Sequence, residues 1–161
     1  MYKTNKIKQD VLSFLKAIDQ DFIPSLSCKV NLEEYIDKIL KKANLICCYS
    51  PNRTLIGLII FYCNNTITHK AYISLVGVHK NFRGKGIAKK MMEECISFID
   101  QQNYPIIGIH SNNPTAIRLY KNFNFQIVEG GTRKYMELNL AENKLLPKVC
   151  RRESQSYQIC R

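Results

Sequence analysis

Two glycines separated by a single residue stand at the junction between a strand pattern and a helix pattern, and this junction is the strongest constraint on the fold. The segment reads NFRGKGIAKK and occupies residues 81–90. It follows the apolar run AYISLVGV and precedes a stretch whose apolar residues recur at helical spacing. The apolar run PIIGI comes next, so strand, helix and strand form a βαβ unit with a parallel pair.

Further patterns place helices and strands before this unit. Apolar residues at helical spacing predict a first helix over residues 7–18, and Asn31 with Glu34 has the spacing of a capping box that starts a second helix. The runs NLICCYS and TLIGLIIFYC flank turn residues at 50–52 and predict a hairpin.

The chain after the βαβ unit shows one more helix and two more strands. Asn113 and Pro114 suit the N-cap and the first position of a helix, and Asn124 suits the left-handed position after its end. The runs FQIVEG and RKYMELNL predict a closing antiparallel pair. The order of elements therefore predicts an α/β (α+β) fold.

Length and composition suit one globular domain, because the chain has 161 residues with 45% apolar and 23% charged residues. No run approaches the roughly 20 apolar residues of a membrane helix, and the N-terminal residues lack the apolar core of a signal peptide. We therefore expect a soluble, cytoplasmic protein without a membrane partner. The seven cysteines show no C-x-x-C spacing, so we expect reduced thiols and no metal site.

The net charge of +11 is the unusual bulk property of the chain. It favours a polyanionic ligand, a nucleic acid, an acidic surface or simply a basic solvated surface. Of these partners we expect a nucleic acid least. Residues 141–161 carry five cations against two glutamates and show weak periodicity. We interpret them as a basic C-terminal tail that follows a domain at residues 1–140.

The glycine junction is suited to holding an anion. A strand that enters a glycine turn and then a helix leaves the N–H groups of the first helical turn without partners, and these groups bind phosphate well. The spacing does not match a Rossmann fingerprint, which needs a small residue where Lys89 stands, and the chain contains no P-loop pattern. A purely structural turn is the alternative interpretation of the two glycines.

Two longer motifs resemble the GCN5-related N-acetyltransferases, the GNAT family. The phrase VGVHKNFRGKGIA is similar to the acyl-CoA loop of that family, Arg/Gln-x-x-Gly-x-Gly/Ala, through Arg83, Gly86 and Ala88. The phrase NPTAIRLYKNFNF resembles its second cofactor segment, and the matching residues there are Asn113, Tyr120 and Phe125. Asn124 replaces the usual glycine, a mild departure because asparagine also tolerates the left-handed conformation.

The resemblance spans roughly residues 45–140 and implies a particular architecture. It implies a single GNAT-like domain with a mixed, mostly antiparallel central sheet, one splayed parallel strand pair and about four flanking helices. Residues 1–44 would form a helical region on the acceptor side, and residues 45–140 would form the acyl-CoA-binding core.

The resemblance also implies a cofactor site. Backbone amides would cradle the pyrophosphate of acetyl-CoA, with Arg83 and Lys85 adding charge, in the loop formed by Arg83, Gly84, Lys85, Gly86, Ile87 and Ala88. The N–H of Val76 would polarise the thioester carbonyl, and Val78 would pair with the pantetheine arm. Gly77 between them would allow a bulge or splay. Asn113 and Tyr120 would also contact the cofactor.

The implied chemistry assigns one proton donor and leaves the base open. Tyr120 would protonate the departing thiolate, since a phenol has a pKa of about 10 and a thiol one of about 8.5. Many relatives carry a glutamate base where this chain has Tyr72 and Gly108. His110 lies on the strand face of Gly108 and would act as the base, directly or through water. The alternative is a hydrogen-bonded histidine at the end of a strand.

The acceptor is the least constrained part of the expectation. In the GNAT fold the first helices and their loop cover the acceptor side, which makes Phe22, Pro24, Ser25 and Ser27 candidates for its lining. A small amine, an amino sugar or its nucleotide, and a protein N-terminus are all compatible acceptors. The alternative from another class is a non-catalytic acyl-CoA or polyanion-binding module. The sequence leaves a monomer and a homodimer equally open.

Overall fold

The computed structural model describes residues 2–142 and 157–160 of the chain. These described residues form four longer helices, one short helix and seven strands, with 3-10 turns at Asp19–Asp21 (η1) and Lys80–Phe82 (η2). The helices are α1 (Tyr2–Ile18), α2 (Leu26–Lys29), α3 (Leu32–Lys42), α4 (Ile87–Gln101) and α5 (Pro114–Asn122). The strands are β1 (Asn44–Tyr49), β2 (Leu55–Tyr62), β3 (Lys70–Val78), β4 (Ile106–Ser111), β5 (Gln126–Glu129), β6 (Lys134–Asn139) and β7 (Tyr157–Cys160).

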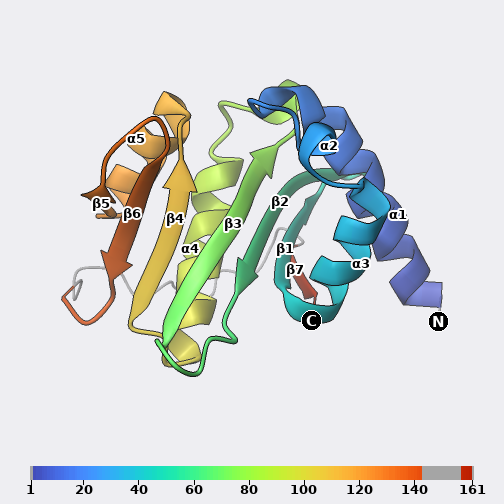
Figure 1. Cartoon of the computed structure of the whole chain (residues 1–161). Helices are drawn as coiled ribbons and strands as arrows, with labels where there is room; N and C mark the ends of the chain where they lie inside the picture. The colour runs from blue at the N-terminus through green and yellow to red at the C-terminus, as the bar shows by residue number, and fades with distance from the viewer. Residues whose placement is uncertain (1, 143–156, 161) are drawn as a thin grey trace.

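The strands form one sheet in the order β5-β6-β4-β3-β2-β1-β7. The β3–β4 pair is parallel, and the other neighbouring pairs are antiparallel. Helix α4 lies behind the middle of the sheet and α5 behind its β4–β6 side, whereas α1 and α3 lie on the opposite face (Figure 1). The predicted mixed, mostly antiparallel sheet with one parallel pair is therefore confirmed.

Two apolar cores fill the space between the sheet and its helices. One core joins the buried face of α4 and part of α5 to the sheet, and it includes Met91, Cys95 and Tyr120. The other joins α1 and α3 to β1, β2 and β3, and it includes Leu15 and Ile36. The described part of the chain contains no helix with the length and apolar character needed to cross a membrane.

The predicted starts of α3 and α5 are confirmed by their capping bonds, whereas α1 begins at Tyr2, before the predicted residue 7. The Asn31 side chain accepts hydrogen bonds from two backbone N–H groups at the start of α3, and the Asn113 side chain does the same at the start of α5. Pro114 occupies the first turn of α5, where its missing N–H costs nothing. After α5, Asn124 has a φ of 66°, the left-handed conformation expected of this residue.

Strand β7 lies within the C-terminal segment interpreted from the sequence as a basic tail, where no strand is predicted. It pairs antiparallel with β1, from Leu45 opposite Cys160 to Cys48 opposite Tyr157. The rest of the predicted tail after residue 142, residues 143–156 and 161, lies outside the described residues. The segment contains only four strand residues, which is too short for a reliable period-2 pattern.

The parallel pair opens into a fork, as the predicted splay required. Pairing between β3 and β4 runs from Lys70 opposite Ile106 to Ile73 opposite Ile109. Beyond this point β3 continues to Val78 and the two strands diverge toward their carboxyl ends (Figure 1). The glycine junction follows β3 at the open end of the fork.

A β-bulge in β3 lies at the point where the fork opens. Against β2 the register changes between Leu75 and Ile73, so Ser74 is the extra residue. The bulge reverses which face the later side chains take: Ile73 packs on the α4 core and Leu75 on the α1–α3 core. Gly77 lies within the splayed part as predicted, but the bulge is three residues earlier than the expected position.

Candidate functional site

The glycine loop adopts a conformation that explains both of its glycines. Gly84 and Gly86 each have a φ of 75°, in the left-handed region that other residues rarely adopt. A Cβ atom built at either position would have no neighbouring heavy atom within 4 Å. The chain therefore turns sharply there, and the space outside the turn is open enough for a ligand to approach the backbone.

The first turn of α4 presents backbone donors to this open space. Gly86 is the N-cap and has no side chain to cap the helix, and the first intrahelical bond runs from the N–H of Lys90 to the oxygen of Gly86 at 3.1 Å. The N–H groups of residues 87–89, which include Ile87 and Ala88, consequently have no partner within the helix. Lys85, Lys89 and Lys90 are exposed around them, so the loop suits an anion.

Arg83 is held in place by the protein. Its Nε donates to the backbone oxygen of Val78 at 2.9 Å, and its guanidinium forms an ion pair with Asp21 in η1. The Nζ of Lys85 lies 5.4 Å from the centre of the Phe82 ring. Arg83 therefore joins the segment after α1 to the glycine loop. This contact is a second role for Arg83, beside the positive charge that the motif predicts it to add at the loop.

The backbone of β3 faces the fork at the two valines predicted to contact the cofactor. The N–H of His79 donates to the oxygen of Ile56 on β2 at 2.8 Å, and hydrogen-bonded and non-hydrogen-bonded pairs alternate along an antiparallel ladder. Val76 and Val78 therefore occupy non-hydrogen-bonded pairs. Their N–H and C=O groups are directed away from β2, toward the side from which β4 has diverged, and the bond from Arg83 to Val78 agrees.

Tyr120 is buried in α5, with 4% of its surface exposed, and its ring centre lies 5.9 Å from that of Phe125. Burial raises the pKa of the phenol, and the neighbouring Tyr72 raises it further. The group is therefore a neutral proton donor across the physiological range. Asn113, seven residues earlier, lies on the same side of the helix and caps it.

His110 and Tyr72 come together at the base of the fork. The Tyr72 hydroxyl lies 3.1 Å from Nδ1 of His110, and the two rings are arranged edge to face with centres 5.9 Å apart. Partial burial lowers the pKa of His110, Arg133 lowers it further, and Glu129 opposes the change. The imidazole is therefore predominantly neutral at pH 7 and has a lone pair available to accept a proton.

Sequence reasoning considered Tyr72 only as the position of an absent carboxylate and missed its contact with His110. The contact depends on the register of the parallel pair, in which Tyr72 lies opposite Gly108, two residues before His110. Period-2 alternation places the two side chains on one face, which is the signal that was available. The register itself needs the tertiary structure.

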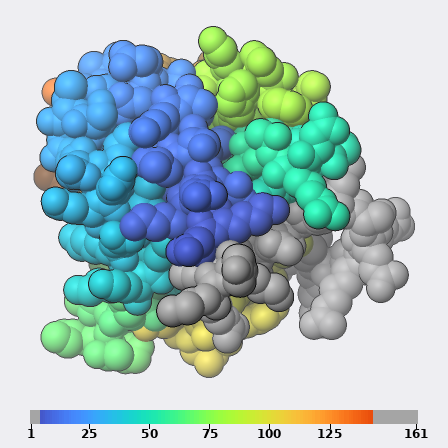
Figure 2. Space-filling view, turned by 90° about the vertical axis from the view of Figure 1, so that its right-hand side faces the viewer, coloured from blue at the N-terminus to red at the C-terminus, as the bar shows by residue number. Residues whose placement is uncertain are grey.

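The predicted acceptor-side residues lie in the segment between α1 and α3. Phe22 is half-buried against the α1–α3 core, the hydroxyl of Ser25 donates to the Cys28 sulfur at 3.0 Å, and that of Ser27 donates to Asp19 at 2.6 Å. The ion pair of Asp21 with Arg83 brings this segment beside the glycine loop, and Figure 2 shows the two segments together at the top of the α1 face. Their role in binding an acceptor stays a prediction.

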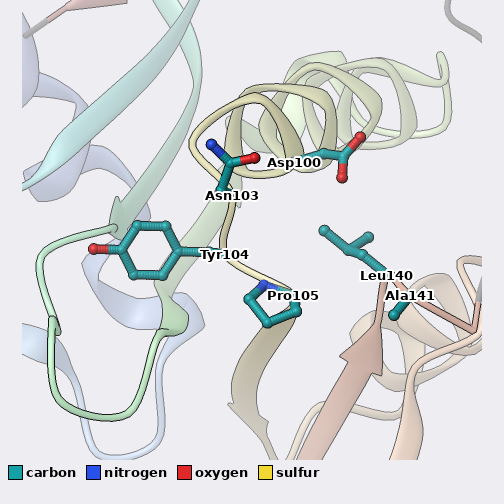
Figure 3. A pocket seen from close by; sticks show the side chains of 6 residues that line it. All are labelled: Asp100, Asn103, Tyr104, Pro105, Leu140 and Ala141. Atoms are coloured by element: carbon teal, nitrogen blue, oxygen red, sulfur yellow. The ribbon is translucent and has the colours of Figure 1, made fainter.

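Two pockets are lined by none of the residues predicted for catalysis or cofactor binding. One of about 310 Å³ is at the C-terminal end of α4 and is lined by Asp100, Asn103, Tyr104, Pro105, Leu140 and Ala141 (Figure 3). The Tyr104 ring points away from Leu140 and Ala141 in this view. A second pocket of about 430 Å³ lies between α5 and the start of β6. In residues 2–142 and 157–160, no group of three or more His, Cys, Asp or Glu side chains is arranged to hold a metal ion.

Comparison with known proteins identifies the architecture. A family model described as Acetyltransferase (GNAT) family matches residues 13–125. The probable N-acetyltransferase san of Drosophila melanogaster is 30% identical over 122 residues, which is 73% of this chain. The chain spans 66% of the length of that curated relative.

Solved structures share the fold at low identity. A GNAT-family acetyltransferase of Staphylococcus aureus Mu50 has a TM-score of 0.68 at 16% identity, over 84% of this chain and 94% of that chain. A GNAT-family acetyltransferase of Elizabethkingia anophelis, solved with acetyl-CoA bound, has a TM-score of 0.56 at 19% identity, over 66% of this chain and 82% of that chain.

The forked mixed sheet, with a glycine loop leading from its open end into α4, is the architecture of an acyltransferase-type α+β domain. The family match covers most of the chain, from residue 13 to residue 125. The chain therefore belongs to the acetyltransferase (GNAT) family.

Proposed function

We propose that this protein is an acetyl-CoA-dependent N-acetyltransferase that acts on a primary amine. The observation that carries the proposal is the fork between β3 and β4, which has the unpaired amides of the first α4 turn at its open end and Tyr72 with His110 at its base. The acceptor on this proposal is a small molecule, such as an amino sugar or its nucleotide, or a protein N-terminus. Membership of the GNAT family supports the reaction class.

We further propose the division of the chain. Residues 1–44 would form the acceptor-side region, residues 45–140 the acyl-CoA core and residues 141–161 a basic tail. The enzyme would work in the cytoplasm, as a monomer or a homodimer.

The residues present fit acetyl-CoA on two independent observations. The open space at Gly84 and Gly86, with positive φ at both, leaves room for a pyrophosphate against the N–H groups of residues 87–89. The alternation of the β2–β3 ladder directs the backbone of Val76 and Val78 into the fork. Val78 would then pair with the pantetheine arm, and the N–H of Val76 would polarise the thioester carbonyl. Bound acetyl-CoA would supply an acyl group already activated for attack by an amine.

His110 would accept the proton of the attacking amine, directly or through a water molecule. Neutral imidazole carries one N–H and one lone pair. If Nδ1 carries the hydrogen and donates to the Tyr72 oxygen, 3.1 Å away, Nε2 keeps its lone pair and is the base. Tyr72 would thus select the productive tautomer, which is how a second group commonly orients a catalytic histidine.

Tyr120 would donate the proton that the departing thiolate needs. Burial raises the pKa of this phenol, so the proton is present at the start of the reaction. The raised pKa also makes the phenol a weaker acid than an ordinary one, so the transfer would depend on the negative charge that develops on the sulfur as the C–S bond breaks. Asn113 would help to hold the cofactor arm beside α5.

Release of free thiol from acetyl-CoA across a panel of amines tests the proposal. The panel includes polyamines, amino sugars, nucleotide-linked amino sugars and peptides with free N-termini. Acceptor-dependent release that is lost in the His110→Ala, Tyr120→Phe double variant is expected. If acetyl-CoA binds in calorimetry but no amine on the panel supports release, the protein is a non-catalytic acyl-CoA-binding module instead.

A further inference from the structure

Gly108 on β4 leaves a space that the side chain of Tyr135 on β6 fills. A Cβ atom built at Gly108 would lie 2.5 Å from the hydroxyl oxygen of Tyr135 and 3.0 Å from its ring. The distance to the hydroxyl oxygen is shorter than real contacts of a Cβ atom, and the distance to the ring is at the tight end of such contacts. The phenol therefore occupies the volume that any larger residue at position 108 would need, including the glutamate that the resemblance predicts for many relatives.

The Tyr135 ring lies directly against the imidazole of His110. The two residues are partners in the β4–β6 ladder, and their ring centres are 4.6 Å apart with an angle of 34° between the ring planes. This spacing is at the close end of the range for favourable aromatic pairs. Tyr72 contacts the imidazole from β3, so His110 is held between a tyrosine from each neighbouring strand.

A hydrogen-bonded chain fixes the far end of Tyr135. Its hydroxyl donates to Glu137 Oε1 at 2.6 Å, and Nζ of Lys70 on β3 lies 2.7 Å from the same oxygen. The Glu137 side chain is 19% exposed, so the ion pair is partly shielded from water. A short bond to a charged acceptor is stronger than a neutral one, and it restricts rotation of the ring.

The Tyr135–Glu137 pair is an anchor and not a second base. Burial and then the bond to Glu137 raise the pKa of Tyr135, so the phenol keeps its proton. Partial burial opposes ionisation of Glu137, but the bonds from Lys70 and Tyr135 outweigh it and lower the pKa of the carboxyl. Near neutral pH the phenol is therefore protonated and the carboxylate ionised.

We propose that Tyr135 is a positioning residue: anchored by Glu137, its ring holds the imidazole of His110 against Tyr72. The proposal rests on the proposed function, in which His110 is the base. The proposal also concerns position 108, where this chain has a glycine and many relatives carry a glutamate. In this chain the nearby carboxylate is that of Glu137 on β6, one strand further along the sheet. It holds the Tyr135 ring against His110 and does not itself act on the amine.

Titration of His110 by NMR tests the proposal without requiring turnover. The chain has three histidines, so comparison with His110→Ala assigns the imidazole signal. The titratable or charged groups that face it are Tyr72 on β3, Tyr135 on β6, Arg133 in the β5–β6 turn and Glu129 on β5. The Tyr135→Leu variant changes only one of them. We expect the titration midpoint of His110 to rise toward about 6.5 in this variant, because water then reaches the imidazole ring.

The kinetic readout is kcat/KM for the acceptor identified in the amine panel. Tyr135→Leu should lower it about 10-fold at neutral pH, because a misdirected base transfers protons poorly, while the affinity for acetyl-CoA is unchanged. Tyr135→Phe keeps the ring and removes the anchoring hydroxyl, and it should lose about threefold. If Tyr135→Leu proves unfolded, Tyr135→Phe and the next variant decide the question.

Gly108→Ala on β4 tests the same contact between Tyr135 and His110 without changing either residue. The added methyl group should displace the Tyr135 ring and move the His110 midpoint in the same direction as Tyr135→Leu. Tyr104→Leu is the matched control, because Tyr104 also lies beside a histidine, His69, with ring centres 6.1 Å apart at the other end of β4. It should leave the His110 midpoint unchanged.

An unchanged His110 midpoint and unchanged kcat/KM in folded Tyr135→Leu and Gly108→Ala proteins would overturn the proposal. Failure of the proposed function gives a different result. In that case no amine supports thiol release by the wild-type protein, yet the midpoint still moves in both variants, and the positioning of the imidazole by Tyr135 stands.

Discussion

At the residue scale, the two side chains that we propose as proton donor and proton acceptor have opposite protonation preferences. Burial raises the pKa of Tyr120, which favours the protonated phenol. Partial burial and Arg133 lower the pKa of His110, which favours the neutral imidazole. A proton donor and a proton acceptor are thus both ready in the same pH range, as acid–base catalysis near neutrality requires.

Tyr120→Phe keeps the ring and its packing but removes the proton donor. We expect kcat to fall about 10- to 10³-fold, toward the lower side of what a positioned acid supplies, because a thiolate leaves more readily than an alkoxide. The affinity for acetyl-CoA should be retained. Single-turnover rates measure the loss, and an acyl donor with a more acidic thiol should lose less. Wild-type rates in the variant would show that the hydroxyl is dispensable.

His110→Ala tests the base through its pH dependence. The folded-state pKa of His110 is lowered, so the wild-type enzyme should stay active at pH 7 and lose kcat/KM as the pH falls below about 6.5. The variant should lose about 10²-fold or more at neutral pH and regain part of the loss as rising pH deprotonates more of the amine. A pH–rate profile gives both limbs. A loss below about threefold would contradict a base role.

At the scale of elements, the junction from β3 to α4 is linked to the segment between α1 and α3, which we propose as the acceptor side. Gly84 and Gly86 form the turn with left-handed backbone. Arg83 holds this turn to β3 through Val78 and to η1 through Asp21. The contacts of Arg83 therefore connect the glycine loop to η1, so a ligand bound at one of these segments can affect the other.

Gly86→Val should weaken acetyl-CoA binding severely. A φ of 75° is strained for a β-branched residue, at a cost of about 1–2 kcal/mol, and the branched side chain would occupy the space facing the α4 amides. Isothermal calorimetry on protein shown to be folded by circular dichroism measures the effect. Gly130→Val in the β5–β6 turn is a control for the added bulk, because a Cβ atom there also meets nothing within 4 Å. Unchanged affinity of the Gly86 variant would remove the anion-cradle interpretation.

Asp21→Asn should remove the ion pair that joins η1 to the glycine loop. The Asp21–Arg83 pair is partly exposed, with side chains 41% and 48% exposed, so its loss should barely change the stability of the fold. We expect the acceptor KM to rise about threefold. Acetyl-CoA should bind slightly more tightly at low salt, because no carboxylate then offsets the positive charge of Arg83. Asp37→Asn removes the comparable Lys8–Asp37 pair and is the matched control. If Asp37→Asn gives the same kinetic changes, the coupling is not specific.

At the scale of the whole molecule, one sheet carries both the site and the C-terminal strand, at different positions. The fork lies between β3 and β4, whereas β7 lies at the edge beyond β2 and β1. Changes at that edge should therefore affect stability and leave the chemistry intact.

Deletion of residues 157–161 should lower stability without lowering activity. The backbone of residues 45–48 on β1 would lose its partners, and β1 would become the exposed edge of the sheet. A loss of about 1–3 kcal/mol in the free energy of unfolding is expected from the lost backbone hydrogen bonds. Urea denaturation measures it, and deletion of residue 161 alone is the control. Unchanged unfolding would mean that β7 contributes nothing to the sheet.

The sequence alone determined the local elements and the loop that suits an anion. Helix starts at Asn31 and Asn113, the left-handed Asn124 and the glycine turn depend on residues only a few positions away, so pattern and propensity predicted them. The βαβ unit followed from the order of elements, because parallel neighbours need a crossover. These predictions needed no knowledge of distant contacts.

Only the tertiary structure decided which side chains surround His110. A shift of register by one residue reverses every side chain on a strand, so the β3–β4 pairing and the β4–β6 pairing together place Tyr72 and Tyr135 on either side of the imidazole. Asp21 lies 62 residues before Arg83, and their ion pair depends on how α1 packs on the sheet. Such contacts arise from packing between distant segments, and local spacing in the chain carries no record of them.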